Sequence, residues 1–309
     1  MGNELSGLTS HSAEYFGDTR DYWWNPDFLQ LMARRWGLHR VREVLDVGCG
    51  VGHWGRLIAG LLPEDARVTG VDREPLWVEK AAERAAARGQ GERFRYQVAA
   101  VEALPFADGT FDMVTCQTVL IHTPDPGAAL AEMIRVVKPG GLVAVVEPNN
   151  AASSLVFDAA TFDAPVDDLV ELVRLQLACE RGKAALGEGN NSLGDRIPAL
   201  FAVQGLADIQ VYLNDKASPL LPPYDTAERR ALVEEITEFA QRDFWLWSRE
   251  DTRRYFLAGG GGEDEFEARW AAALRRSRAT AAAIAQGTYS SAGGSIAYLV
   301  SGTKPAPAR

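Results

Sequence analysis

The sequence predicts an α/β fold built on a doubly wound, mainly parallel sheet, and three observations lead to this prediction. Short runs of apolar and β-branched residues alternate with amphipathic stretches between residues 41 and 147, as crossover helices between parallel strands require. One of these runs, Glu43–Val47, breaks directly into alternating glycines. The next run ends on a carboxylate, Asp72. We therefore expect these turns at the carboxyl edge of the sheet, where ligands bind in such folds.

Each expected element has its own local signal. Residues 43–47 have no polar interruption before Asp46, which suits a strand buried on both faces. Pro75 and Pro126 fit the first turn of a helix, where the missing N–H is not needed. The expected strands are 43–47, 67–71, 94–98, 111–116, 141–147, 208–213 and 294–302. The expected helices between them are 52–62, 75–88 and 126–137.

Two insertions separate the last strands, and apolar residues at helical spacing predict helices in both. Segments of this length are rarely plain loops, so we expect a helical cap over the edge of the sheet. The apolar positions are Val166, Val170, Val173 and Leu177, then Leu232, Ile236, Phe239 and Phe244 behind an Asp225…Glu228 capping pattern, and finally Phe266, Trp270 and Leu274. The expected divisions are an N-terminal helical lid at 1–40, a core at 41–150, cap insertions at 151–205 and 219–290, a core strand at 206–218, and a final strand and tail at 291–309.

The composition argues against several classes of function. A formal charge of −10 and a pI near 5.0 disfavour a nucleic-acid partner, which clustered Lys and Arg would bind. No segment approaches the roughly 20 apolar residues of a membrane span, so no membrane partner is expected. The three cysteines and four histidines show no paired or metal-ligand spacing. We therefore expect no metal site and a reducing, cytoplasmic location.

The glycines at positions 48, 50 and 52 are the strongest chemical signal in the chain. Glycine lets the main chain turn sharply and approach a ligand that any Cβ would exclude. The helix that follows directs free N–H groups to the same place, and Asp72 can accept both hydroxyls of a ribose. These features predict a nucleoside cofactor. Because residues 50–55 also fit the dinucleotide fingerprint, a nicotinamide-dependent oxidoreductase stays an alternative.

Several motifs in order make a larger pattern. They are Val-Leu-Asp-Val-Gly-Cys-Gly-Val-Gly at 44–52, Val-Asp at 71–72, Glu-Ala-Leu-Pro-Phe at 102–106, Phe-Asp-Met-Val at 111–114 and Arg-Val-Val-Lys-Pro-Gly-Gly at 135–141. Over roughly residues 40–148 the chain resembles the class I S-adenosylmethionine-dependent methyltransferases, in the group that methylates small molecules. The resemblance implies a Rossmann-like seven-stranded sheet whose last strand, here 294–302, is antiparallel. It implies S-adenosylmethionine as the cofactor and a small organic molecule as the methyl acceptor.

The resemblance also implies positions for the cofactor. Asp46, Gly48 and Gly50 would approach its methionine portion, with Cys49 between the glycines and Gly52 helping the turn. Asp72 would hold the ribose hydroxyls. Since Ala100 stands where relatives often have an aspartate, backbone groups of nearby residues would hold the adenine. The remaining expected contacts are Arg73 or Glu74 beside the adenine, Val101 and Glu102 in place of the missing aspartate, Gln117 near the transfer site, and Tyr15 and Tyr22 from the N-terminal segment.

Two residues are candidates for a general base, which is needed only if the acceptor must lose a proton. His122 titrates near neutral pH without perturbation, although its position is often structural in this family. Glu147 ends the fifth expected strand and could equally bind a backbone amide. A noncatalytic cofactor-binding protein therefore stays a further alternative.

The second insertion suggests what the acceptor is like. Residues 244–247 (Phe-Trp-Leu-Trp) beside Arg249, Arg253 and Arg254 would suit a bulky acceptor that carries a carboxylate. The other interpretation is a solvated helix face on which Glu250 and Asp251 neutralise the arginines. The sequence predicts neither the oligomeric state nor which atom, O, N or C, receives the methyl group.

Overall fold

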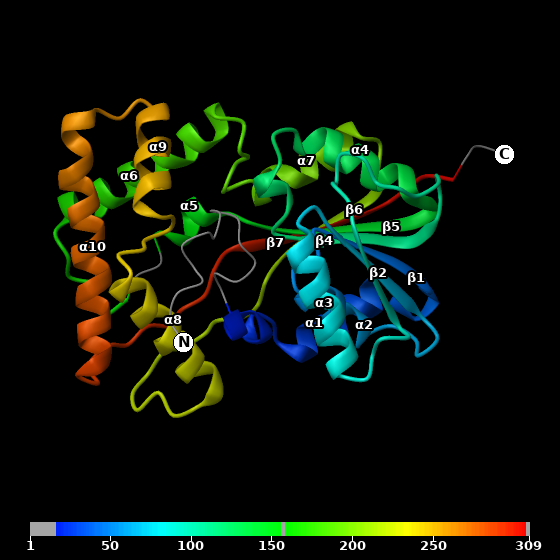
Figure 1. The fold of residues 1–309 in the computed structure, drawn as a ribbon, viewed down its shortest axis with the longest axis horizontal. Helices are drawn as coiled ribbons and strands as arrows, with labels where there is room; N and C mark the ends of the chain where they lie inside the picture. Colours follow the sequence, from blue (N-terminus) through cyan, green and yellow to red (C-terminus); the bar gives the residue numbers. More distant parts are fainter. Residues whose placement is uncertain (1–16, 156–157, 307–309) are drawn as a thin grey trace. The chain divides into compact units, whose positions relative to one another are not determined.

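The computed structural model describes residues 17–155 and 158–306, which form two compact units (Figure 1). The sheet unit comprises Trp24–Asn149, Ser192–Asp215 and Ile296–Arg309. The helical unit comprises Met1–Trp23, Asn150–Asn191 and Lys216–Ser295. Tyr15, an expected cofactor contact, lies outside the described residues.

The described part of the sheet unit is built on seven strands in the order β3-β2-β1-β4-β5-β7-β6. Strands β1 to β5 pair in parallel, and β7 runs antiparallel to both of its neighbours. The strands are β1 (Glu43–Val47), β2 (Arg67–Asp72), β3 (Phe94–Val98), β4 (Phe111–Gln117), β5 (Val137–Pro148), β6 (Ala207–Leu213) and β7 (Ala297–Thr303). The predicted fold class and antiparallel last strand are confirmed. Strand β5 begins four residues earlier than expected, directly after a helix.

Helices cover both faces of this sheet, as Figure 1 shows. On one face lie α1 (Pro26–Arg35), α2 (His53–Ala59) and α3 (Pro75–Ala87), and on the other lie α4 (Pro126–Val136) and α7 (Ile197–Val203). The two prolines begin their helices as predicted, and the Asp125 carboxylate caps α4 by accepting from Ala128 N at 2.9 Å. Because β1, β2 and β4 are parallel neighbours, their carboxyl ends meet at one edge.

The helical unit has a core of its own. Its described helices are η1 (Gly17–Tyr22), α5 (Asn150–Ser153), α6 (Val166–Ala185), α8 (Ala227–Gln241), α9 (Arg249–Ala258) and α10 (Glu263–Ala285). Helices α6 and α9 cross so closely that a Cβ on Gly182 would overlap the Tyr255 carbonyl oxygen. Phe266, Trp270 and Leu274 are buried on α10 as predicted, and they pack with aromatic residues of α9.

Both insertions contain helices, as expected, but two details of the helical unit differ from the sequence pattern. On α6, Val166, Val170 and Leu177 are 72%, 46% and 39% exposed. The buried face instead carries Leu175, Gln176, Cys179, Glu180, Gly182 and Lys183. This buried face includes Gly182, where α6 packs closely against the Tyr255 carbonyl oxygen of α9.

The start and end of α8 also differ from expectation. Thr226 is its N-cap and accepts from Arg229 N at 3.2 Å, so the cap is not Asp225. Phe244 lies beyond the end of α8, where its ring packs 4.9 Å from that of Phe239.

None of the described helices combines the length and the apolar character needed to cross a membrane. The described residues also contain no group of three or more His, Cys, Asp or Glu side chains arranged to hold a metal ion.

Candidate functional site

The turn between β1 and α2 forms a glycine loop, residues 48–52. Gly48, Gly50 and Gly52 have φ angles of 62°, 51° and 83°, which L-residues with a side chain rarely adopt. The loop is tied to the neighbouring strand by a hydrogen bond from Cys49 N to Val71 O at 2.9 Å. The alternating glycines therefore stand at positions where the backbone needs a positive φ angle.

Asp72, at the end of β2, lies directly beside this loop. Its Oδ2 accepts from Gly50 N at 2.9 Å, and its Oδ1 accepts from Glu74 N at 3.0 Å. A carboxylate oxygen has two lone-pair sites, so each oxygen keeps one for a further donor. The structure thus places the Asp72 carboxylate beside the glycine loop, as the sequence predicted. The spare acceptor sites of this carboxylate suit the two hydroxyls of a diol.

Asp46 is fully buried at the base of the site. Its Oδ2 accepts from Gly55 N at 3.0 Å, which braces the first turn of α2. The pKa of Asp46 is raised to about 8, chiefly because the carboxyl is buried; the Gly55 hydrogen bond opposes this rise and the nearby Asp72 adds to it. Burial of Asp46 in the folded protein therefore favours its protonated form.

Cys49 contributes to the site through its main chain. Its side chain is buried, and burial, with the nearby carboxylates of Asp46 and Asp72, raises the pKa of its thiol well above the usual value. A thiol in this state is a poor nucleophile.

Tyr96 on β3 lies below the glycine loop and was missed by the sequence reasoning. It pairs with Gly70 on β2, and a Cβ on Gly70 would lie 2.6 Å from the Tyr96 ring. A Cβ on Gly52 would lie 2.8 Å from its hydroxyl oxygen. The one available signal was the glycine inside an otherwise apolar strand, which often marks a close approach of another group.

The expected adenine contacts follow β2 and β3. Arg73 and Glu74 are exposed and form a loose ion pair with an Nε–Oε1 distance of 3.6 Å. The Val101 side chain is buried in the core, so only its main chain is available to a ligand, and Glu102 is exposed. Ala99 N donates to Asp72 O at 2.9 Å, which fixes this segment beside β2.

Glu147, at the end of β5, is fully buried and binds main-chain amides. Its Oε1 accepts from Val119 N and Leu120 N at 2.9 and 2.7 Å, and its Oε2 lies 3.4 Å from Ile121 N. The side chain thereby holds the short helix η3 (Leu120–His122) against the sheet. This geometry supports the amide-binding interpretation over that of a general base.

The segment between β4 and η3 carries two other residues of interest. Gln117 ends β4 and is half-buried, and His122 ends η3 and is also half-buried. Between them, Thr118 has a φ of 56°, which is unusual for a β-branched residue. Backbone strain of this kind is often found at functional sites, and nothing in the sequence indicated it.

The remaining predicted residues belong to the helical unit. Tyr22 ends η1 and is half-buried. Trp247 is buried in the aromatic core. Arg249 pairs with Glu267, Arg253 with Glu263, and Arg254 with Glu188 and Asp251. The interpretation as a neutralised helix face was therefore right for these arginines, although most of the partners are not the ones expected.

Comparison with known proteins shows which families the chain resembles. The model of a family described as a methyltransferase domain matches residues 44–141. The ubiquinone/menaquinone biosynthesis C-methyltransferase of Geotalea daltonii is 34% identical over 119 residues, which cover 37% of this chain and 51% of the relative. The ubiquinone biosynthesis O-methyltransferase of Thiobacillus denitrificans is 33% identical over 164 residues, or 48% of this chain and 68% of the relative.

A solved structure supports the fold over most of the chain. The YcgJ protein of Bacillus subtilis superposes with a TM-score of 0.51 at 22% identity, covering 91% of this chain and 99% of that protein. The chain spans about half the length of the Geotalea relative and about two thirds of the Thiobacillus relative. The glycine loop, the Asp72 carboxylate that ends β2 and these matches together show that the chain belongs to the class I S-adenosylmethionine-dependent methyltransferase family.

Proposed function

We propose that this protein transfers a methyl group from S-adenosylmethionine to an O, N or C atom of a small organic molecule. The observation that carries the proposal is the pairing of the left-handed glycine loop with the Asp72 carboxylate, which accepts from Gly50 N at 2.9 Å. A main chain free of Cβ atoms beside a carboxylate with spare acceptor sites fits an aminoacyl nucleoside. Family membership favours this cofactor over a dinucleotide.

In this proposal, residues of the sheet unit hold most of the cofactor, and two tyrosines of the N-terminal segment complete the contacts. Asp72 holds the ribose hydroxyls, and the main chain at Gly48 and Gly50 receives the methionine portion. When bound, the cofactor supplies a methyl group already activated on a sulfonium. The other proposed contacts are Asp46, Cys49 and Gly52 around the methionine portion, Arg73, Val101 and Glu102 around the adenine, and Gln117, Tyr15 and Tyr22 near the transfer site.

The protein's own work is then to align the acceptor and exclude water. In-line transfer from an activated donor gains much of its acceleration from alignment. Of the two candidate bases, we retain His122, because the Glu147 carboxylate is already engaged by main-chain amides. His122 would accept a proton only from an acceptor that must lose one.

The acceptor is proposed to be bulky and partly aromatic. The two relatives are named for ubiquinone and menaquinone biosynthesis, which supports testing phenols and hydroquinones first. A carboxylate clamp by Arg249, Arg253 and Arg254 is not part of the proposal, because each already pairs with a carboxylate. The N-terminal segment and the insertions at 151–205 and 219–290 are proposed to recognise the acceptor. The three free, buried cysteines support a cytoplasmic location.

Calorimetry and a transfer assay test this function together. Titration with S-adenosylmethionine and with its demethylated product should show saturable binding, whereas NADH should show none. Transfer of a labelled methyl group should then be measured across a panel of phenols, hydroquinones and amines. Binding of NADH in place of both sulfur cofactors would overturn the proposal in favour of an oxidoreductase.

A further inference from the structure

A second concave site of the sheet unit lies between α2 and α3, and arginines surround it. It is lined by Val51 and Gly52 of the glycine loop, by His53 and Arg56 of α2, and by Arg84 and Arg88 of α3. Gln90, Phe94 and Tyr96 complete the polar and aromatic wall. We call this site the arginine pocket. None of the functions assigned above to the glycine loop and Asp72 uses its arginines.

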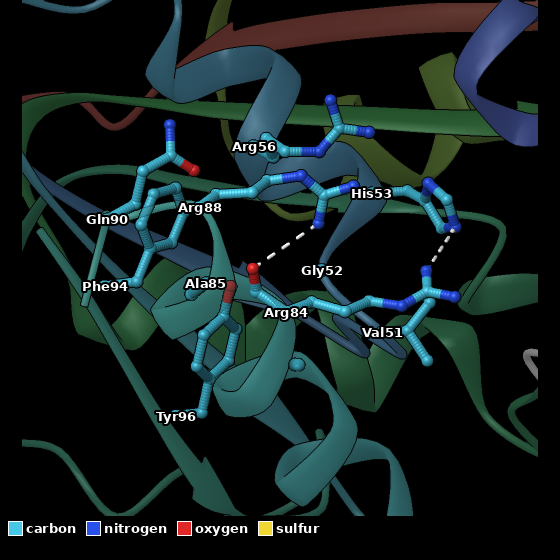
Figure 2. Close-up of a pocket in the computed structure, with 11 residues that line it drawn as sticks. Val51, Gly52, His53, Arg56, Arg84, Ala85, Arg88, Gln90, Phe94 and Tyr96 are labelled. Atoms are coloured by element: carbon cyan, nitrogen blue, oxygen red, sulfur yellow. Dashed lines mark hydrogen bonds between the residues drawn. The ribbon is translucent and has the colours of Figure 1, made fainter.

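The helical register of α3 creates the pocket. Ala81 and Ala85 are four residues apart on α3, and Arg84 and the C-cap residue Arg88 each lie three residues after one of these alanines, so the four side chains lie near one face of the helix. The two alanines are buried and small, which leaves space between α3 and α2. The two arginines extend from the same face, and Figure 2 shows both beside this space, with Arg56 from α2 nearby.

The guanidinium groups of Arg84 and Arg88 make few contacts. Arg84 Nη1 lies 3.2 Å from His53 Nε2, and Arg88 Nη1 donates to the Arg84 carbonyl oxygen at a long distance of 3.5 Å (Figure 2). Among the described residues, neither Arg84 nor Arg88 pairs with a carboxylate. Both therefore keep donors available for a ligand, since a guanidinium has five N–H groups.

The charge of the pocket lining contrasts with that of the whole chain. No Asp or Glu lines the pocket, although the chain carries 42 acidic residues and a formal charge of −10. Several other arginines of the chain pair with carboxylates, as Arg135 does with Glu132 and Asp108. The positive charges of Arg84 and Arg88, whose contacts are to His53 and to a carbonyl oxygen, repel one another, so an anion between them would relieve that repulsion.

We propose that the arginine pocket binds a small oxyanion of the phosphate type. Arginine forks match the geometry of phosphate oxygens and bind them through paired, charge-assisted hydrogen bonds. The pocket has a cavity volume of about 10 Å³, which is room for about one water-sized group. The anion would thus insert one oxygen and lie at the open mouth, between Arg84 and Arg88, which favours a single phosphoryl group over a whole nucleotide.

Titration calorimetry with inorganic phosphate tests the proposal, and sodium chloride at equal ionic strength removes the general effect of salt. A second titration with glycerol 3-phosphate distinguishes free phosphate from an organic phosphate ester. Saturable heat with either ligand is expected for the wild type. Arg84→Gln and Arg88→Gln should each weaken binding about tenfold or more, because each removes charge-assisted hydrogen bonds.

Arg95→Gln is the matched control. Arg95 precedes Tyr96 on β3, is exposed and does not line the pocket, and alternate residues of a strand point to opposite faces. This variant loses the same charge and should change phosphate affinity less than about twofold, since distant exposed charges are screened. Equal weakening in Arg88→Gln and Arg95→Gln, or no saturable binding in the wild type, would overturn the proposal.

Folding and the methyltransferase proposal are controlled separately. Arg88 is exposed and makes a single long hydrogen bond, so Arg88→Gln should keep the wild-type melting temperature and circular dichroism spectrum. The titrations contain no S-adenosylmethionine. Their outcome therefore stands whether or not the proposed transfer activity is found.

Discussion

The two units of this protein use carboxylates in different ways. In the sheet unit, Asp46, Asp72 and Glu147 each bind main-chain amides at the ends of strands. In the helical unit, several acidic side chains pair with arginines, as Glu263 does with Arg253. Main-chain contacts demand a particular backbone conformation, whereas exposed ion pairs tolerate many alternatives.

This difference explains why the sheet unit contains recognisable sequence motifs and the helical unit does not. A loop with three left-handed residues selects glycine at fixed positions. The close crossing of α6 and α9 also requires glycine, at Gly182 and Gly259, but these lie far apart in sequence and form no motif. The comparison predicts that the helical unit depends on packing for stability, and that the sheet unit uses its backbone for binding.

The largest effect is expected at the helix crossing. In Gly182→Ala the new Cβ would overlap the Tyr255 carbonyl oxygen, and overpacking against rigid backbone costs about 3 kcal/mol or more. Chemical unfolding followed by circular dichroism measures this loss. Gly91→Ala is the control, since nothing lies within 4 Å of its Cβ position. Equal stability of the two variants would show that the crossing is not tight.

The next effect concerns the pH dependence of stability. Because the folded-state pKa of Asp46 is raised to about 8 from 3.8, its protonated form stabilises the fold fully below pH 3.8, and this contribution is lost as the pH rises toward 8. The loss is about 1.4 kcal/mol per pH unit between the two values. Asp46→Asn lacks this titration.

The free energy of unfolding of the wild type, relative to Asp46→Asn, should therefore fall by about 2–3 kcal/mol between pH 5 and pH 7. Urea unfolding of both proteins at the two pH values measures this difference. A constant difference would mean that Asp46 is ionised throughout.

A smaller loss of stability is expected within the glycine loop. Gly48→Ala places a Cβ on a residue with φ of 62°, against the Val119 side chain, at a cost of about 1–2 kcal/mol for the left-handed backbone. Because the loop must shift, affinity for the demethylated cofactor should fall at least about tenfold. Gly89→Ala has a similar φ of 68° with open space around it, so it should lose similar stability and keep its affinity.

The smallest effect is expected at an exposed ion pair of the helical unit. Arg253 Nε lies 3.0 Å from Glu263 Oε1, with both side chains about half exposed. Arg253→Ala should cost less than about 1 kcal/mol, since such pairs are screened by solvent. Thermal unfolding measures it. A larger loss would show that ion pairs, and not only packing, hold this unit together.

The parts predictable from sequence are those where local chemistry leaves little choice. The alternating glycines, Pro75, Pro126 and the Asp72 carboxylate all indicated their structural roles correctly. Tyr96 was missed because its position below Gly70 depends on strand register. The strain at Thr118 depends on how Glu147 holds the turn that follows it. The orientation of α6 depends on its packing against a helix that is distant in sequence. Each of these is a tertiary contact without a local signal.

The central claim is that Asp72 grips the ribose of the cofactor beside the glycine loop, and calorimetry with the demethylated cofactor tests it most directly. Asp72→Ala removes two charge-assisted hydrogen bonds and should weaken binding about 100-fold or more. Asp65→Ala, which removes an exposed carboxylate paired with Arg42, should bind like the wild type. Undiminished affinity in Asp72→Ala, with a normal circular dichroism spectrum, would contradict the account.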